Sequence, residues 1–233
     1  MPQKHIRTAR FIAIFSGILL LCALLLDIAV YGSWKDFLRP YVLSFDGAVI
    51  ESIRIHTSEA LSRSMILITE CGSTIFYVTI GGIITITLCL KRKIAEGIML
   101  VVCSGGSGLM TLLLKEIVMR IRPDMMPIIA ETGYSFPSGH SVTAVCFYGY
   151  LAYLCWSQGR GDIVRRGSVI AAVCMIIGIG ISRIYLGVHF PTDVIGGYIG
   201  GLMWLSLSIL VLDYINKKSC HWLVPHNKKK TLQ

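Results

Sequence analysis

A histidine and an aspartate in the last quarter of the chain have the types and spacing for nucleophilic chemistry. His189 precedes Asp193 by four residues, and Pro191 between them is typical of the first turn of a helix. This spacing lets the carboxylate contact one imidazole nitrogen, which fixes the tautomer and leaves the other nitrogen free as a nucleophile or base. Arg183, a little earlier in the chain, adds a cation to the same cluster.

A second polar cluster, Pro137-Ser138-Gly139-His140, lies at the predicted start of a helix. The first amides of a helix have no intrahelical acceptor, so they can bind an anion. Gly139 lets the backbone approach a ligand closely. His140 is a titratable group that can exchange a proton at the same place.

Two cations make up the third cluster. Lys115 and Arg122 are seven residues apart, and Pro123 follows directly. On a helix this separation is about two turns, so we predict that both cations project from one face and that Pro123 ends the helix. An arginine fork beside a mobile lysine charge suits a phosphate.

Each cluster alone also fits an ordinary feature of a membrane protein: snorkelling basic residues, a capped helix start or an interfacial ion pair. All three are predicted to lie on one side of the membrane, however. Together they hold what phosphoryl transfer needs, namely cations for the equatorial oxygens, an in-line nucleophile and a proton for the leaving group. The sequence has no HExxH motif, acidic cluster or Cys/His ligand set, so we expect no metal and no other cofactor.

The three clusters resemble the motifs of the type 2 phosphatidic acid phosphatase superfamily, Lys-x6-Arg-Pro, Pro-Ser-Gly-His and Ser-Arg-x5-His-x3-Asp, in order and without departure. Weaker similarity surrounds Asp46 and Gly72. The resemblance implies a six-helix membrane phosphatase in which His189 forms a phosphohistidine, Asp193 orients it and His140 protonates the leaving group. The residues that it implies for phosphate binding are Lys115, Arg122, Ser138, Gly139 and Arg183.

Helices in a membrane must position these residues. Hydrophobic residues make up 54% of the 233-residue chain and charged residues only 15%, and the eight cysteines show neither a disulfide framework nor a metal pattern. We therefore predict an all-α polytopic membrane protein, with one domain over residues 1–233 and a motif core at about residues 94–212. An amphipathic surface helix is predicted at residues 44–64. The six predicted transmembrane segments are residues 11–31, 66–90, 94–114, 141–156, 168–182 and 194–212.

The basic residues predict the orientation of these segments. They are more numerous at the segment ends that share a side with both termini, including a basic tail at residues 217–233, than at the ends that carry the motifs. By the positive-inside rule both termini are cytoplasmic, and the motifs lie on the outer face of a cell membrane, periplasmic or extracellular. Several glycines are predicted to let helices pack closely, namely Gly105, Gly106, Gly108, Gly196, Gly197, Gly200 and Gly201.

The leading hypothesis is an integral membrane lipid phosphatase that acts on phosphatidate, phosphatidylglycerophosphate, undecaprenyl pyrophosphate or a lipid A phosphate. The alternatives are a hydrolase of soluble phosphates, as in the sugar-phosphatase branch, and a transporter or headgroup receptor. Transporters more often carry charges near the bilayer centre, and the apolar runs argue against the soluble haloperoxidase branch. The expected partners are the lipid phosphate and membrane lipids, with no nucleic acid and no obligate protein partner.

Overall fold

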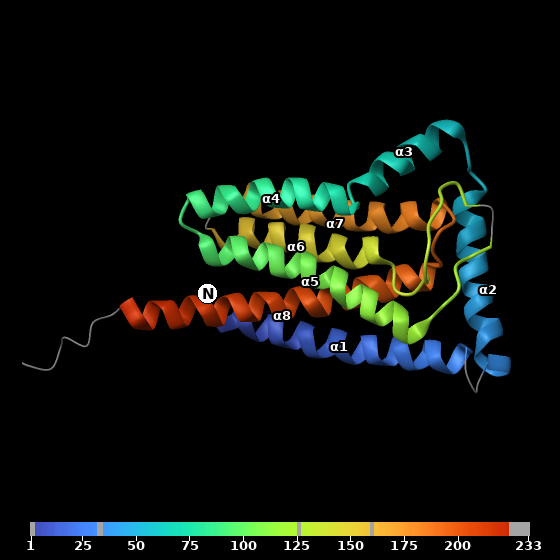
Figure 1. Ribbon diagram of the computed structural model, residues 1–233, viewed down its shortest axis with the longest axis horizontal. Helices are drawn as coiled ribbons and strands as arrows, with labels where there is room; N and C mark the ends of the chain where they lie inside the picture. The colour runs from blue at the N-terminus through green and yellow to red at the C-terminus, as the bar shows by residue number, and fades with distance from the viewer. Residues whose placement is uncertain (1–2, 32–34, 125–126, 159–160, 224–233) are drawn as a thin grey trace, which may run out of the picture.

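The computed structural model describes residues 3–31, 35–124, 127–158 and 161–223, which form eight helices and no strands (Figure 1). The helices are α1 (Gln3–Tyr31), α2 (Lys35–Arg54), α3 (Glu59–Glu70), α4 (Thr74–Leu90), α5 (Ile94–Val118), α6 (Gly139–Ser157), α7 (Asp162–Tyr185) and α8 (Pro191–Leu223). The all-helical prediction is confirmed.

Helix α6 lies in the middle of the bundle, in contact with α5, α7 and α8. Its residues Val142, Cys146 and Tyr150 are fully buried. The helices around it expose apolar side chains instead, as Ile86 of α4 and Leu112 of α5 do. A buried central helix inside a ring of apolar outer faces is the arrangement expected of a bundle whose surroundings are lipid.

Three helices are long and apolar enough to cross a membrane: α5, α7 and the Pro191–Lys217 part of α8. Helices α3 and α4 meet at a bend of 47°. Taken together as one bent element, they are long and apolar enough to make a fourth span. Within the described residues the structure thus supports three or four crossings. The count of six remains a prediction.

The bend divides the predicted segment at residues 66–90, which is therefore not one continuous helix. Ser73 caps α4, because its hydroxyl accepts a hydrogen bond from the amide of Phe76 at 3.2 Å. At Gly72 the backbone comes so close to α7 that an added Cβ would lie 2.9 Å from Cγ2 of Ile179. The cap and the close approach place the break at these two residues.

The predicted surface helix at residues 44–64 is wrong in its bounds. Helix α2 lies across one end of the bundle and ends at Arg54. Ser58 then caps α3, accepting a hydrogen bond from the amide of Leu61 at 3.3 Å. The serine starts a new helix, so the predicted stretch belongs to two elements. Helix α2 is amphipathic as expected, since Ile50 is buried and Tyr41 is exposed.

Glycines on α8 bring it against α6, as the sequence predicts. A Cβ at Gly197 would lie 2.8 Å from the carbonyl oxygen of Ser138, and one at Gly201 would lie 2.8 Å from that of Val142. Real side chains do not tolerate such distances, so these two positions require glycine for the observed packing.

The glycines of α5 have two different roles. Gly106 faces α8, where an added Cβ would overlap the ring of Trp204. Gly105 and Gly108 have no neighbouring atom within 4 Å of an added Cβ, so the prediction that they bring helices together is wrong. They border a cavity instead, which is described below.

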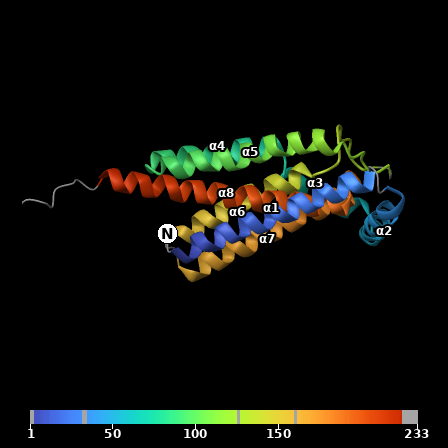
Figure 2. The same cartoon turned by 90° about the horizontal axis from the view of Figure 1, so that it is seen from below.

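The start of α1 and the end of α8 lie at the same end of the elongated bundle, and α2 lies at the opposite end (Figures 1 and 2). The basic turn at Lys91–Lys93, which joins α4 to α5, is at the end that carries the termini. The described chain therefore begins and ends at the same end of the bundle, as an even number of crossings requires. Arg160 and Lys228–Lys230, which contribute to the predicted charge bias, lie outside the described residues.

Candidate active site

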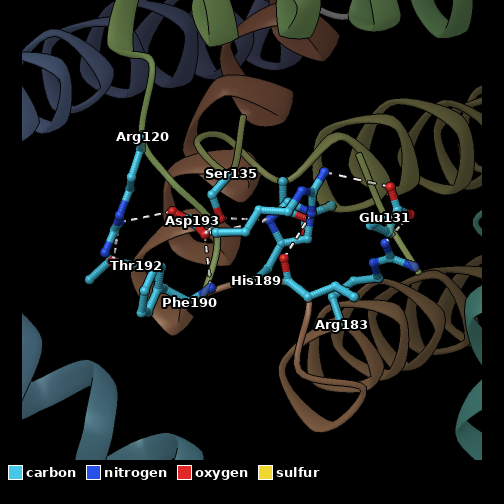
Figure 3. Close-up of polar contacts among 12 residues, drawn as sticks. Arg120, Glu131, Ser135, Arg183, His189, Phe190, Thr192 and Asp193 are labelled. Atoms are coloured by element: carbon cyan, nitrogen blue, oxygen red, sulfur yellow. Dashed lines mark hydrogen bonds and ion pairs between the residues drawn. The ribbon is translucent and has the colours of Figure 1, made fainter. Parts of the chain in front are cut away.

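The polar clusters meet at the α2 end of the bundle, where the segments after α5 and α7 face the starts of α6 and α8 (Figure 3). His189 lies in the short connection between α7 and α8, and its side chain is 2% exposed. Helix α8 begins at Pro191, as the sequence predicts. Asp193 therefore falls in the first helical turn, where a carboxylate also meets the positive end of the helix.

The carboxylate of Asp193 contacts one nitrogen of the His189 ring. Nδ1 lies 3.4 Å from Oδ2 of Asp193, which confirms the contact that the spacing predicts. The same oxygen accepts hydrogen bonds from the amide of Phe190 at 2.8 Å and from the hydroxyl of Ser135 at 2.5 Å. Nδ1 of His189 is thus directed at a fixed acceptor, and Nε2 faces away from Asp193.

The surroundings of His189 keep it neutral at physiological pH. Burial lowers the pKa of the imidazole, Asp193 opposes this effect, and the cations Arg122 and Arg183 add to it, so that the pKa is about 4. A neutral ring has an unprotonated nitrogen with a free lone pair. The geometry makes Nε2 that nitrogen.

Arg122 is fixed beside Nε2 by backbone carbonyl groups. Its guanidinium donates to the carbonyl oxygens of Val188 at 2.8 Å, Gly133 at 3.0 Å and Thr132 at 3.0 Å. One terminal nitrogen, Nη1, lies 3.3 Å from Nε2 of His189. A group that reacts at Nε2 therefore meets a pre-oriented cation.

Arg122 reaches this place from a loop, so the prediction of one helical face for Lys115 and Arg122 is wrong. Helix α5 ends at Val118, well before Pro123, because Met119 is left-handed with φ 51° and its amide closes the last turn on the carbonyl oxygen of Lys115. Lys115 stays in the last turn of α5.

Arg183 is 1% exposed and extends from the last turn of α7. It donates to the hydroxyl of Thr69 at 3.0 Å and forms an ion pair with Glu131. Among the described residues its Nε–H group has no hydrogen-bond partner. A buried donor without an acceptor is costly, so this arginine is prepared for an additional anionic ligand.

Glu131 lies between the two arginines of the site. It pairs with Arg183 and its other oxygen is 3.5 Å from Nη2 of Arg122. Partial burial raises the pKa of this carboxyl, but the two arginines outweigh that effect and the pKa is lowered overall. An ionised carboxylate therefore occupies the space between the cations that the motifs associate with phosphate.

The start of α6 faces the same space. Ser138 is the buried N-cap residue, and its amide donates to the carbonyl oxygen of Asp193 at 3.0 Å, so this amide is already engaged. The next amides, those of Gly139 and His140, head the helix and have no intrahelical acceptor. The His140 ring interacts electrostatically with Lys115, Arg183 and His189, and the predicted residues are therefore brought together.

Four residues of the site escaped the sequence analysis: Asp46, Arg120, Glu131 and Ser135. Arg120 lies within the first motif and Ser135 directly before the second, so position along the chain gave a weak signal for these two. Asp46 lies far away in sequence, and only the weak similarity around it pointed there. No group of three His, Cys, Asp or Glu side chains suited to a metal occurs among the described residues.

An apolar cavity of about 700 Å³ opens beside the site. Lys115 and His140 are at its polar end, and it continues between α4, α5 and α6. Its walls include four glycines whose missing side chains leave room, Gly81, Gly82, Gly105 and Gly108. The cavity thus joins the cationic site to the apolar surface of the bundle.

Comparison with known proteins gives consistent matches. The sequence pattern of the PAP2 superfamily matches residues 96–217. Phosphatidylglycerophosphatase B of Bacillus subtilis is 36% identical over 168 residues, which cover 71% of this chain and 82% of that protein. The crystal structure of a transmembrane PAP2 type phosphatidylglycerolphosphate phosphatase from Bacillus subtilis has a TM-score of 0.74 at 29% identity, and covers 88% of this chain and 96% of that one. Lipid A 1-phosphatase of Rhizobium johnstonii is 35% identical over 43% of this chain and 41% of that protein.

Proposed function

The chain belongs to the PAP2 superfamily, as a membrane lipid phosphatase of that type, and we propose that it hydrolyses a lipid phosphomonoester or pyrophosphate through a phosphohistidine at His189, without a metal. The observation that carries the mechanism is the arrangement around the His189 ring. Nδ1 contacts Asp193 and Nε2 lies beside the Arg122 guanidinium.

In the first step Nε2 of His189 attacks phosphorus, an N–P bond forms and the bond to the leaving oxygen breaks. That oxygen takes a proton from His140, whose protonated form the bound phosphate favours by its negative charge. In the second step water attacks phosphorus, His140 accepts the proton of the water, and the N–P bond breaks. Inorganic phosphate is released, and both histidines return to their starting states.

The cations stabilise the charge on the transferring phosphoryl group. Arg122 and Arg183 offer oriented donors, and Lys115 adds a mobile charge. Gly139 supplies a backbone amide, and Ser138 supports the turn that presents it. The buried Nε–H group of Arg183 without an acceptor supports an anion at this position. The carboxylate of Glu131 is the group that an incoming phosphate has to displace or accommodate.

The cavity between α4, α5 and α6 favours a lipid over a soluble phosphate. It begins at Lys115 and His140 and is lined further on by apolar and glycine residues, with a few serine and threonine residues among them. A soluble sugar phosphate makes no use of such an apolar space, whereas an acyl or polyprenyl chain fills it with dispersion contacts. We accordingly propose one membrane-embedded domain with the site on the outer face and both termini in the cytoplasm.

Phosphate release by the purified protein in detergent tests this function. The substrates are dioleoyl phosphatidate, phosphatidylglycerophosphate, undecaprenyl pyrophosphate, a lipid A phosphate and glucose 6-phosphate, each with and without EDTA. We expect release from at least one lipid, slower release from the sugar phosphate, and no effect of EDTA. Exclusive use of the sugar phosphate would favour the soluble-phosphate alternative. Activity that EDTA removes and a divalent ion restores would contradict metal independence.

A further inference from the structure

A second arginine of the first motif, Arg120, is buried behind the catalytic histidine. It is 1% exposed, which is rare for arginine unless its charge is paired. Its guanidinium donates to Oδ1 of Asp193 at 2.8 Å (Figure 3). It also donates to Oδ2 of Asp46 at 2.7 Å, and both of these carboxylates are buried. Arg120 thus joins the aspartate that contacts the nucleophile to an aspartate on α2.

The two oxygens of Asp193 have different partners. Oδ1 accepts from Arg120, whereas Oδ2 accepts from Ser135 and lies 3.4 Å from Nδ1 of His189. A carboxylate held at both oxygens cannot rotate, so Arg120 fixes the direction in which Oδ2 meets the imidazole. The Arg120 side chain thus orients the His189 ring through Asp193.

Arg120 also positions Ser135 through its backbone. Its carbonyl oxygen accepts a hydrogen bond from the amide of Ser135 at 2.7 Å. The left-handed Met119 directly before it ends α5, and the guanidinium packs over the Phe190 ring at 4.3 Å from the ring centre. Arg120 is therefore held on several sides in the place where it meets Asp193.

Asp46 ties α2 to the start of α8. It accepts hydrogen bonds from the amide of Thr192 at 3.0 Å and from the hydroxyl of Thr192 at 2.8 Å, in addition to its ion pair with Arg120. The amide of Thr192 is in the first turn of α8, so Asp46 acts as a capping carboxylate supplied by another helix. The helix that crosses the end of the bundle thus holds the turn that carries the catalytic dyad.

We propose that Arg120 and Asp46 are positioning residues of the phosphatase, and that α2 sets the geometry of His189 through the chain Asp46–Arg120–Asp193. The inference rests on the proposed function of His189. It predicts that the charges of these three residues change the pH at which the His189 imidazole is protonated, as well as fix its orientation. Loss of the Arg120 cation leaves more negative charge near the ring, and loss of the Asp46 charge leaves less.

The test measures kcat and KM against pH for purified variants in detergent, with dioctanoyl phosphatidate as the probe. Arg120→Met should lower kcat by about 10–100-fold, the range for lost outer-shell partners, with a smaller change in KM. In the plot of kcat against pH, it should also move the acidic limb, which is the fall of kcat toward low pH, to higher pH. Asp46→Asn should lower kcat less and move the limb to lower pH, because the unbalanced guanidinium disfavours the imidazolium. This shift should be smaller than that of Arg120→Met, because burial raises the pKa of the Asp46 carboxyl and makes its charge the weaker of the two at acidic pH.

Two further variants separate charge from geometry. Arg120→Lys keeps the cation but cannot bridge two carboxylates, so kcat should stay low while the limb stays in place. The double variant R120M/D46N removes one positive and one negative charge from the group near the ring. The acidic limb of its pH profile should therefore return toward that of the wild type, without recovery of kcat. Arg63→Met is the control, because Arg63 pairs with Glu59 on the exposed surface of α3.

Several outcomes would overturn the inference. These are a kcat of Arg120→Met within twofold of the wild type, a lowered kcat with no movement of the limb, or the same limb shift in Arg120→Met and Asp46→Asn. If Arg120→Met does not fold, Asp46→Asn and the double variant decide by the same criteria. Failure of the proposed function is distinct, because the wild type would then release phosphate from none of the four lipids named above. If the wild type hydrolyses another of these lipids but not phosphatidate, that lipid is the probe.

Discussion

The two ring nitrogens of His189 have different surroundings, and in the proposed mechanism this asymmetry decides which one reacts. Nδ1 is directed at Asp193 and Nε2 lies beside Arg122. A nucleophile needs a lone pair on the nitrogen that faces the substrate, with the opposite nitrogen held by a charge that stabilises the phosphorylated ring. The surroundings of the His189 ring supply both.

The roles of the two histidines can be separated with a pair of substrates. His189→Ala should lower turnover by at least about 10⁴-fold on any substrate, because no other nucleophile is placed to replace it. His140→Ala should lower monoester hydrolysis by about 10²–10⁴-fold, the range for a lost general acid. It should affect a pyrophosphate less, because phosphate is a better leaving group than an alcohol.

Release of phosphate from phosphatidate and from undecaprenyl pyrophosphate checks these expectations, and trapping of labelled phosphate on His189 in the His140→Ala protein checks the intermediate. Near-normal turnover by His189→Ala on either substrate would show that another residue is the nucleophile.

The pH profile should report the lowered pKa of His189. Protonation of Nε2 removes the nucleophile, so kcat/KM should fall as the pH drops through about 4, the pKa to which burial lowers the ring. An unperturbed imidazole would titrate at about 6.5. The measurement is kcat/KM from pH 3.5 to 8 with two substrates whose phosphates differ in pKa. An acidic limb at the same pH with both substrates reports a group of the protein rather than of the substrate. If that limb lay near pH 6.5, the prediction would be contradicted.

At the residue scale the sequence predicted the groups that face the substrate better than the groups behind them. The types and spacing of the motif residues predicted that four of them lie together: Arg122, His140, Arg183 and His189. Arg120 was counted only as a basic residue at a helix end, since nothing in the local sequence shows that Met119 turns left-handed. Its partner Asp46 lies on a helix that only the folded chain brings near. Long-range pairs of this kind are set by tertiary packing, which one sequence does not reveal.

Among the helices, α4 and α5 define the apolar cavity, and their glycines can be tested as its lining. Gly108→Leu should fold normally, because an added Cβ meets no atom within 4 Å. Its side chain would occupy part of the cavity and raise KM for dioleoyl phosphatidate about fivefold, the loss expected for about ten carbon–carbon contacts at about 0.1 kcal/mol each. Hydrolysis of glucose 6-phosphate, where it is measurable, should change little.

Gly167→Leu is the matched control for this substitution. Gly167 also has open space around an added Cβ, and it lies near the start of α7, outside the cavity. Equal KM values for the long-chain lipid in Gly108→Leu and in the wild type would show that the lipid chain lies elsewhere.

Apolar runs predicted the existence of the helices but not where they bend or end. The run at residues 66–90 continues through Gly72 and Ser73 in hydropathy, yet a serine cap divides it. Helix α5 ends at Val118 although the helical pattern extends toward Pro123. Caps and left-handed turns depend on single backbone conformations, to which a hydropathy pattern averaged over many residues is insensitive.

For the whole molecule, the start of α1 and the end of α8 lie at one end of the bundle and the candidate site lies at the other, beside α2. The charge bias predicts that the end with the termini is cytoplasmic. In intact cells a membrane-impermeant thiol reagent should label Asp124→Cys near the site and should label Arg166→Cys only after the membrane is opened. Both residues are exposed, so access to the reagent depends on the side of the membrane.

The measurement requires a background in which the accessible native cysteines, such as Cys71 and Cys174, are replaced by serine. Labelling of Arg166→Cys alone in intact cells would reverse the topology and place the site in the cytoplasm.

The cavity and the loops beside His189 open toward different surroundings, and this has a consequence for the direction of the reaction. The cavity leads from His140 between α4 and α5, whereas Thr132 and Gly133 on the other side of the site are exposed. In a lipid phosphatase of this shape, the dephosphorylated lipid diffuses away in two dimensions within the bilayer, and inorganic phosphate is diluted in the aqueous phase. Resynthesis would require both products to return from separate phases at once, so their dilution into two phases lowers the rate of the reverse reaction at the site.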